Sequence, residues 1–263
     1  MTVERPNRPG ETSSGVQSLD RAFGLLERLA DAGGSASISE LASTTGLPLP
    51  TIHRLVRSLV TGGYVRQLPS RRYALGPSLV RLGAAAEHQL ADWAVPHLVR
   101  VVEKVGESAN LAVLDADAVV YVAQAPSPHS MRMFTEVGRR VLPHCTGVGK
   151  ALLSVLSDDQ VRAILARTGM PAQTEHTITS PEELIAELAV IRARGYAIDD
   201  AEQEDGVRCV AVPVPSRLPG NAGISVSGPS SRLTTERVAQ IAPVLVAATV
   251  DLVADLAEST ANH

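Results

Sequence analysis

Aromatic residues and cysteines are scarce in this sequence. The chain of 263 residues contains two Cys, two Phe, one Trp and four Tyr. So few rings argue against a stacking platform for single-stranded nucleic acid, and the core has to be built from Leu, Val, Ile and Ala. No paired Cys or His spacing suited to structural zinc occurs. We therefore expect no metal site and no cofactor.

Targeting signals are missing as well. The N-terminus has no signal-peptide apolar core, and we find no apolar run that looks long enough to cross a bilayer. Two cysteines far apart in the sequence fit a reducing compartment. These absences predict a cytoplasmic protein without membrane contact, and the length predicts about two domains.

Charge is divided unequally along the chain. The net charge is −4, yet residues 1–83 carry +4 and residues 84–263 carry −8. Between positions 38 and 83, Glu40 is the only acidic residue. A positive surface attracts a polyanion such as DNA. The basic residues of this stretch are Arg54, Arg57, Arg66, Arg71, Arg72 and Arg81.

Helical periodicity organises the N-terminal part. Residues 1–14, rich in Pro, Gly, Ser, Thr and charge, predict a disordered arm. A short helix is expected over residues 38–44 with Ser39 near its start, and a third helix follows Pro50. YVRQ and RRYALG flank LPS and predict a hairpin. The first helix is indicated by apolar residues at helical spacing, namely Val16, Leu19, Phe23, Leu26 and Ala30.

The third helix has an apolar and a polar face. A short helix, a tight turn at Gly46 and a second helix that presents Thr, His and Arg are typical of a helix-turn-helix, whose second helix enters the major groove. The hairpin then serves as a wing that grips phosphates. Any one arginine can be explained as surface solvation, but six in one unit favour DNA binding. The candidate DNA-binding residues are Thr51, His53, Arg54, Arg57, Arg71 and Arg72.

Six blocks of the sequence resemble the IclR family of bacterial transcriptional regulators. VQSLDRAFGLLERLAD, SISELASTTGLPLPTIHRLVRSLVTGGYV and RRYALG resemble its winged helix-turn-helix. LPHCTGVGKALLSVL, GYAIDDAEQEDGVRCVAVPV and AGISVSGPSSRLT resemble its effector-binding domain. Pro50 departs from the polar residue that members often carry. The resemblance implies an α+β protein with a winged helix-turn-helix domain over 15–76, a linker helix over 77–94 and a GAF-like mixed α/β effector-binding domain over 95–260.

A protein of this kind binds DNA as a symmetric oligomer. Paired half-sites require paired recognition helices, so we expect a homodimer or tetramer on a near-palindromic operator. Trp93, near the end of the linker helix, packs either within the chain or across a dimer. The sequence leaves both options open.

Cys209 follows five acidic residues between Asp199 and Asp205 and lies in an apolar strand. A catalytic thiol needs a base and an electropositive surround, which this segment does not offer. Cys145 has His144 beside it, but adjacent strand residues point to opposite faces. A pocket wall or a small buried hydrophobe suits either cysteine better.

The resemblance implies an effector pocket. The residue types fit a small carboxylate, because Gly147 opens a helix with unpaired N–H groups and two serines share a strand face. A turn, strand filler and a cap are the plainer explanations for the same residues. Met131 and Met133 on an expected strand are candidates for a pocket wall or for core. The implied effector-binding residues are Gly147, Val148, Asp199, Cys209, Ser225 and Ser227.

The expected function is ligand-responsive DNA-binding transcriptional regulation without enzyme activity, more often repression by family habit. HSMRMFTEVGRR resembles members linked to glyoxylate and ureide metabolism, which suggests glyoxylate or a ureide acid as the effector. Two alternatives remain open. One is a thiol-dependent enzyme domain fused to a DNA-binding module, and the other is constitutive architectural DNA binding.

Overall fold

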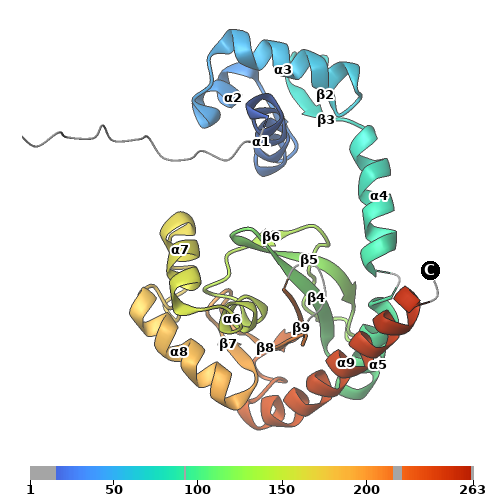
Figure 1. The fold of residues 1–263 in the computed structure, drawn as a ribbon, viewed down its shortest axis with the longest axis vertical. Coiled ribbons are helices and arrows are strands. Elements are labelled where there is room, and N and C mark those ends of the chain that lie inside the picture. The colour runs from blue at the N-terminus through green and yellow to red at the C-terminus, as the bar shows by residue number, and fades with distance from the viewer. Residues whose placement is uncertain (1–15, 92, 216–220, 262–263) are drawn as a thin grey trace, which may run out of the picture. The chain divides into compact units, whose positions relative to one another are not determined.

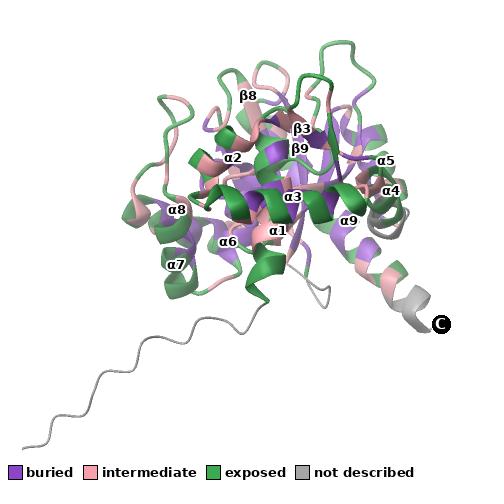
Figure 2. Cartoon of the chain, turned by 90° about the horizontal axis from the view of Figure 1, so that it is seen from above, coloured by how far each residue is buried: buried purple, intermediate pink, exposed green. Residues whose placement is uncertain are grey.

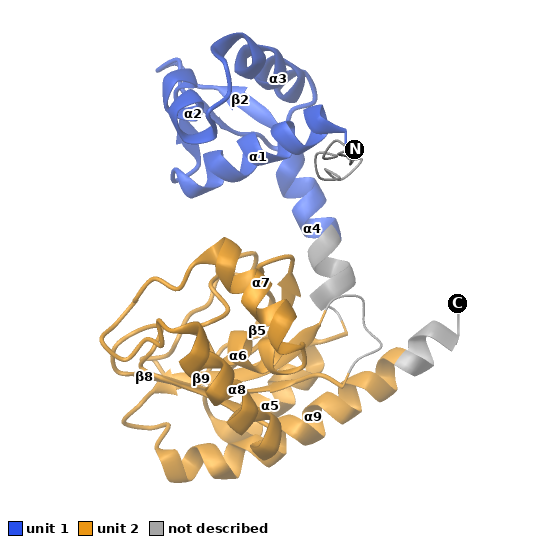
Figure 3. Ribbon diagram, turned by 60° about the vertical axis from the view of Figure 1, so that its left-hand side comes forward, with its two compact units in different colours: residues 1–86 blue, residues 87–263 orange. Residues whose placement is uncertain are grey.

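The computed structural model describes residues 16–91, 93–215 and 221–261. Contacts divide the chain into two compact units, residues 1–86 and 87–263 (Figure 3). The disordered arm that we expect over residues 1–14 lies outside the described residues. The boundary between the units falls inside α4 (Ser78–Ala91), within the stretch that the sequence assigns to a linker helix.

Three helices and a small antiparallel sheet form the first unit. The sheet has the strand order β1-β3-β2, and the helices close over a core that includes Leu25, Leu29, Ile52 and Val56. The predicted winged helix-turn-helix is confirmed; β1, of two residues, is too short for a sequence pattern to reveal. The elements are α1 (Gln17–Asp31), β1 (Ser35–Ala36), α2 (Ile38–Thr45), α3 (Leu49–Thr61), β2 (Val65–Gln67) and β3 (Tyr73–Leu75).

The start of α2 is fixed by a capping box. Ser39 lies near the start of the helix as expected, and the N-cap is Ser37: its Oγ accepts a hydrogen bond from Glu40 N at 3.2 Å, and Glu40 Oε2 accepts from Ser37 N at 2.6 Å. This reciprocal pair satisfies two N–H groups that the first turn leaves unpaired. Gly46 ends the helix at φ 67, a conformation that glycine adopts without strain.

The first helix has two apolar faces. Leu25 and Leu29 are fully buried in the unit's core, whereas Leu19 is 53% and Phe23 62% exposed. With residues of α4 that include Leu82, this second face lines an apolar groove of ≈ 680 Å³. The apolar stripe seen in the sequence is thus an open face of the unit and not its core.

The second unit is a six-stranded antiparallel sheet covered by helices on both faces (Figure 1). The strand order is β6-β5-β4-β9-β8-β7, so the last strand along the chain lies in the middle of the sheet. The helices are α5 (Val95–Val105), α6 (Gly147–Ser154), α7 (Asp158–Thr168), α8 (Pro181–Arg194) and α9 (Thr235–Ala261). The strands are β4 (Ser108–Asp115), β5 (Ala118–Ala125), β6 (Arg140–Val141), β7 (Ala197–Asp200), β8 (Val207–Pro213) and β9 (Ala222–Pro229).

Alternation along the strands divides the core into two layers. Val210 and Val212 face a cluster with α5 and α9, while Ala211 between them faces a cluster with α6, α7 and α8. Because both faces are covered, the central strands are buried at nearly every position. The predicted α+β class, with a mixed sheet-and-helix domain after the winged unit, is confirmed.

The expectation that no apolar run is long enough to cross a bilayer is wrong. Within the described residues, α9 is long and apolar enough over Thr235–Leu256 to span a bilayer by length and composition alone. The core helix of a globular domain passes the same test, and Ile241, Leu245 and Leu252 of α9 are buried in the first of the two clusters. One face of α9 is thus buried in the core, whereas Val246 and Val250 on the rest of the helix are exposed.

A buried ion pair joins three elements of the second unit. Lys150 of α6 is 1% exposed, and its Nζ donates to the carboxylate of Glu202 in the turn after β7. Glu187 Oε1 of α8 lies 3.9 Å from the same ammonium. Burial raises the pKa of Glu202, and the charge of Lys150 opposes that shift. The charge of Lys150 therefore helps to keep the buried carboxylate of Glu202 ionised.

We predict that Lys150→Met lowers the free energy of unfolding by about 3–5 kcal/mol, because it leaves a carboxylate buried without a counter-charge. The measurement is urea unfolding followed by circular dichroism. The control is Arg162→Met, which removes an exposed partner of Glu182 and should leave stability nearly unchanged. Equal losses in the two variants would contradict the prediction.

Candidate functional sites

The outer face of α3 is polar and open to solvent. His53, Arg54 and Arg57 are exposed, and Thr51 is half-buried; Figure 2 shows exposed and buried stretches alternating along this helix. Neither arginine forms an ion pair with a described residue. The two guanidinium groups are therefore available to an outside partner, while the buried face of the helix holds its orientation.

The two arginines of the hairpin have different surroundings. Arg71 closes the four-residue turn that begins at Leu68, with φ 63 and an exposed side chain. The guanidinium of Arg72 instead donates to Glu40 Oε1 at 3.1 Å and to the carbonyl of Ser35 at 3.0 Å. Arg72 ties the hairpin to the cap of α2, and Arg71 is left at the tip.

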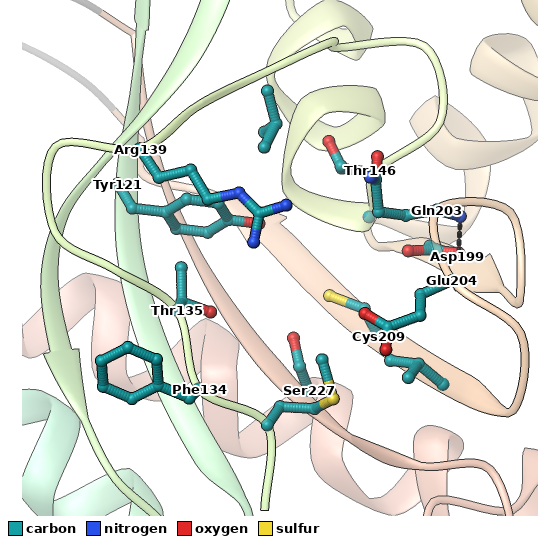
Figure 4. Close-up of a pocket in the computed structure, with 14 residues that line it drawn as sticks. Tyr121, Phe134, Thr135, Arg139, Thr146, Asp199, Gln203, Glu204, Cys209 and Ser227 are labelled. Carbon is teal, nitrogen blue, oxygen red and sulfur yellow. Dashed lines mark hydrogen bonds between the residues drawn. The ribbon is translucent and has the colours of Figure 1, made fainter. Parts of the chain in front are cut away.

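A pocket of ≈ 70 Å³ opens in the second unit, beside the start of α6 (Figure 4). Its walls come from β5, from the segment between β5 and α6, and from β7, β8 and β9. This volume suits a small molecule. The lining residues are Tyr121, Met133, Phe134, Thr135, Arg139, Val141, Thr146, Gly147, Asp199, Gln203, Glu204, Val207, Cys209 and Ser227.

Four of the six implied effector residues line this pocket: Gly147, Asp199, Cys209 and Ser227. Val148 does not, because its side chain packs in the core cluster under α6. Ser225 does not line it either. It is fully buried two residues from Ser227 on β9, and its Oγ has no hydrogen-bond partner.

Gly147 is required by the close approach of α6 to β8. A Cβ atom at this position would lie 2.8 Å from Cys209 Sγ, closer than non-bonded atoms allow. Thr146 caps the helix by accepting from Gly149 N at 3.2 Å. The first turn of α6 thus lies directly beside the Cys209 thiol.

Both thiols are unsuited to nucleophilic chemistry. Burial, helped by the nearby charge of Asp199, raises the pKa of Cys145 and of Cys209 to about 12, so both remain protonated at neutral pH. Cys145 Sγ donates to Gln203 Oε1 at 3.0 Å. His144 Nε2 lies 3.2 Å from the carbonyl of Pro171. His144 therefore does not serve as a base for Cys145, and with both thiols protonated the hypothesis of a thiol-dependent enzyme loses its nucleophile.

Asp199 shapes the acidic turn that follows β7. Its Oδ1 accepts from Glu202 N at 2.8 Å and from Gln203 N at 3.4 Å. Burial nevertheless raises the pKa of its carboxyl group to about 7, since desolvation outweighs the two hydrogen bonds. Asp199 is thus both a cap for the turn and a buried polar group in the pocket wall.

Several lining residues were not predicted from the sequence. Tyr121, Arg139 and Glu204 come from separate segments, and no local motif connects them. Met133 lines the pocket as one of the proposed wall residues, but Met131 is 72% exposed, and the strand expected around them does not form. Across the part of the chain that the structure describes, no three His, Cys, Asp or Glu side chains are grouped to hold a metal ion.

Comparison with known proteins places both units in one family. Residues 18–69 match the IclR helix-turn-helix domain, and residues 83–253 match the C-terminal domain of the bacterial transcriptional regulator IclR. The transcriptional repressor IclR of Escherichia coli is 38% identical over 240 residues, which cover 89% of this chain and 87% of that protein.

Two solved structures have the same fold over nearly the whole chain. An IclR-type regulator from Silicibacter sp. TM1040 has a TM-score of 0.80 at 29% identity and covers 89% of this chain and 94% of its own. An IclR homologue from Microbacterium hydrocarbonoxydans, complexed with 4-hydroxybenzoate, has a TM-score of 0.73 at 25% identity and covers 92% and 99%. These relatives are regulators and not enzymes. The chain belongs to the IclR family of DNA-binding bacterial transcriptional regulators.

Proposed function

We propose that the chain is a repressor whose affinity for operator DNA is controlled by a small carboxylate bound in the pocket of the second unit. One observation carries the proposal: an exposed cationic helix and a pocket lined partly by polar side chains occur in separate units of one chain. The Escherichia coli relative is a repressor, and the Microbacterium relative holds an aromatic hydroxy acid. A bacterial transcriptional regulator acts in the cytoplasm, where the chromosome lies.

Control would operate by a population shift. A ligand that binds one arrangement of the second unit more tightly than another changes the proportion of each. The linker helix would transmit that change to the recognition helices, whose spacing has to match two half-sites. Glyoxylate and ureide acids are the candidate effectors that the 129–140 segment suggests.

DNA contact is assigned to Thr51, His53, Arg54 and Arg57 on α3 and to Arg71 at the hairpin tip. The exposed guanidinium groups of α3 support base readout, because arginine binds guanine with two parallel hydrogen bonds. Arg72 is expected to contribute less to DNA binding, since its guanidinium already binds Glu40 and Ser35.

Alanine at Arg54 should weaken binding to the operator by about 1–3 kcal/mol and relax base preference, if the residue makes a two-bond base contact. Alanine at Arg71 should weaken binding to all sequences alike and reduce the salt dependence, because a phosphate contact releases counterions. Fluorescence anisotropy on operator and random duplexes at several salt concentrations measures both effects. Unchanged operator affinity in the Arg54/Arg57 double alanine variant would contradict the assignment.

We place the interface of a homodimer at the apolar groove between α1 and α4. Its walls include Leu19, Phe23 and Leu82, of which Phe23 is 62% exposed. An exposed apolar surface of this kind marks an interface. A second copy of the chain supplies the same surface, and two-fold pairing would give the two recognition helices that a palindromic operator needs.

Phe23→Glu should convert the dimer to a monomer and weaken operator binding, because a charge in the interface has no partner there. Sedimentation velocity and anisotropy measure the two effects. Val190→Glu is the control, since Val190 of α8 is 51% exposed, lies outside the groove and belongs to the second unit. A Phe23→Glu protein that remains dimeric would place the interface elsewhere.

Cys209→Phe should abolish release of the operator by acids without changing DNA affinity in their absence. The larger ring fills the pocket beside Gly147, whereas the winged unit keeps its own core. Cys209→Ser, of nearly the same size, should keep a partial response. The measurement is a mobility shift of operator DNA titrated with glyoxylate, allantoate and 4-hydroxybenzoate. Full release by the same acid in the Cys209→Phe protein would place the pocket elsewhere.

A further inference from the structure

The pocket is electrically polarised, and this polarity was not evident in the sequence. Asp199 and Glu204 lie on the side formed by β7 and the following turn, and Arg139 lies on the opposite side with Tyr121 (Figure 4). Arg139 is the only Lys or Arg among the lining residues. Its guanidinium forms no ion pair with any residue that the structure describes. Glu204 likewise has no cationic partner among those residues.

The backbone places Arg139 and Tyr121 together. Val119 pairs with Val141 and Val120 with Arg140, and Tyr121 N donates to the carbonyl of Arg139 at 3.2 Å. Cross-strand neighbours project to the same face of a ladder, so both side chains reach the pocket. The residue between Arg139 and Val141 projects to the other face. Arg140 accordingly binds Asp115 Oδ2 at 2.6 Å and does not line the pocket.

The Tyr121 hydroxyl is a second donor at this end. It makes no hydrogen bond with a described residue, and burial raises the pKa of the phenol, so it keeps its proton. The strand pairing sets Arg139 beside this phenol, and the positive charge of Arg139 accordingly lowers the pKa of Tyr121 in part. A guanidinium and a phenol hydroxyl that are both unpaired form a receptor for carboxylate oxygens.

From this geometry we infer that Arg139, with Tyr121, anchors the carboxylate of the effector, while Asp199 accepts a hydrogen bond from a donor at the ligand's other end. The inference deepens the proposed pocket function and rests on it. The start of α6 also offers N–H groups to an anion, but the Asp199 carboxylate in the same pocket opposes a second negative charge there whenever it is ionised. At the Arg139 end the charge is complementary. The preferred ligand class is therefore a small acid with a hydroxyl or N–H group remote from its carboxylate.

The test compares acids with their neutral amides by titration calorimetry on the full-length protein. The probes are 4-hydroxybenzoate with 4-hydroxybenzamide, and glyoxylate with glyoxylamide. Arg139→Gln should weaken binding of the acid roughly ten- to a hundredfold, the effect of losing a charged hydrogen bond, and bring the ratio of acid to amide affinity close to one. Arg139→Lys keeps the charge and should restore part of the preference.

Arg140→Gln is the matched control. It removes the same charge from the next residue, whose side chain binds Asp115 and does not line the pocket. Equal acid affinities in the Arg139→Gln and Arg140→Gln proteins, with binding still lost in Cys209→Phe, would overturn the role of Arg139 and leave the pocket in place. Acid binding that survives Cys209→Phe, or no binding of either acid by the wild type, would overturn the pocket and this inference together.

Discussion

The buried pair of Lys150 and Glu202 is the interaction on which the pocket depends. Two charges inside a protein are tolerated only when each compensates the other, so α6 and the turn after β7 must stay in register. Gln203 and Glu204 of that turn line the pocket, and the Asp199 carboxylate accepts a hydrogen bond from the backbone of the turn. The position of the acidic side of the pocket is thus set by a contact outside the pocket itself.

The same constraint explains the acid-rich segment before Cys209. Asp199 caps the turn, Glu202 neutralises a buried lysine, and Asp200 binds Arg208 through its Oδ1 at 2.6 Å. Three of the five acids thus have structural partners. Glu204 is the acid of this segment that faces the pocket without one. Cys209 is a compact, protonated side chain that allows α6 to approach β8 closely.

Sequence patterns predicted those features that local physics determines. The amphipathic face of α3 and the left-handed glycines that end α2 and α8 follow from residues close together in the chain. Sequence patterns cannot show what covers an apolar face. The exposure of the α1 face that contains Phe23 could therefore not be predicted. Such patterns also could not bring Tyr121 and Arg139 together, because the pairing of β5 with β6 spans a long connection. The N-cap of α2 was not identified from the sequence, because Ser37 and Ser39 are the same residue type and only the backbone conformation distinguishes them.

Net charge alone would argue against an anionic ligand for the second unit. Residues 84–263 carry a formal charge of −8, which favours cations in its surroundings. Screening, however, limits exposed charges to a range of about 8 Å at physiological ionic strength, so the nearest groups decide what a pocket binds. Arg139 and Tyr121 at one end and Asp199 at the other impose an orientation on any acid that enters. A ligand bound in a fixed orientation contacts both walls, and contact with both walls is what allows binding to favour one arrangement of the domain over another.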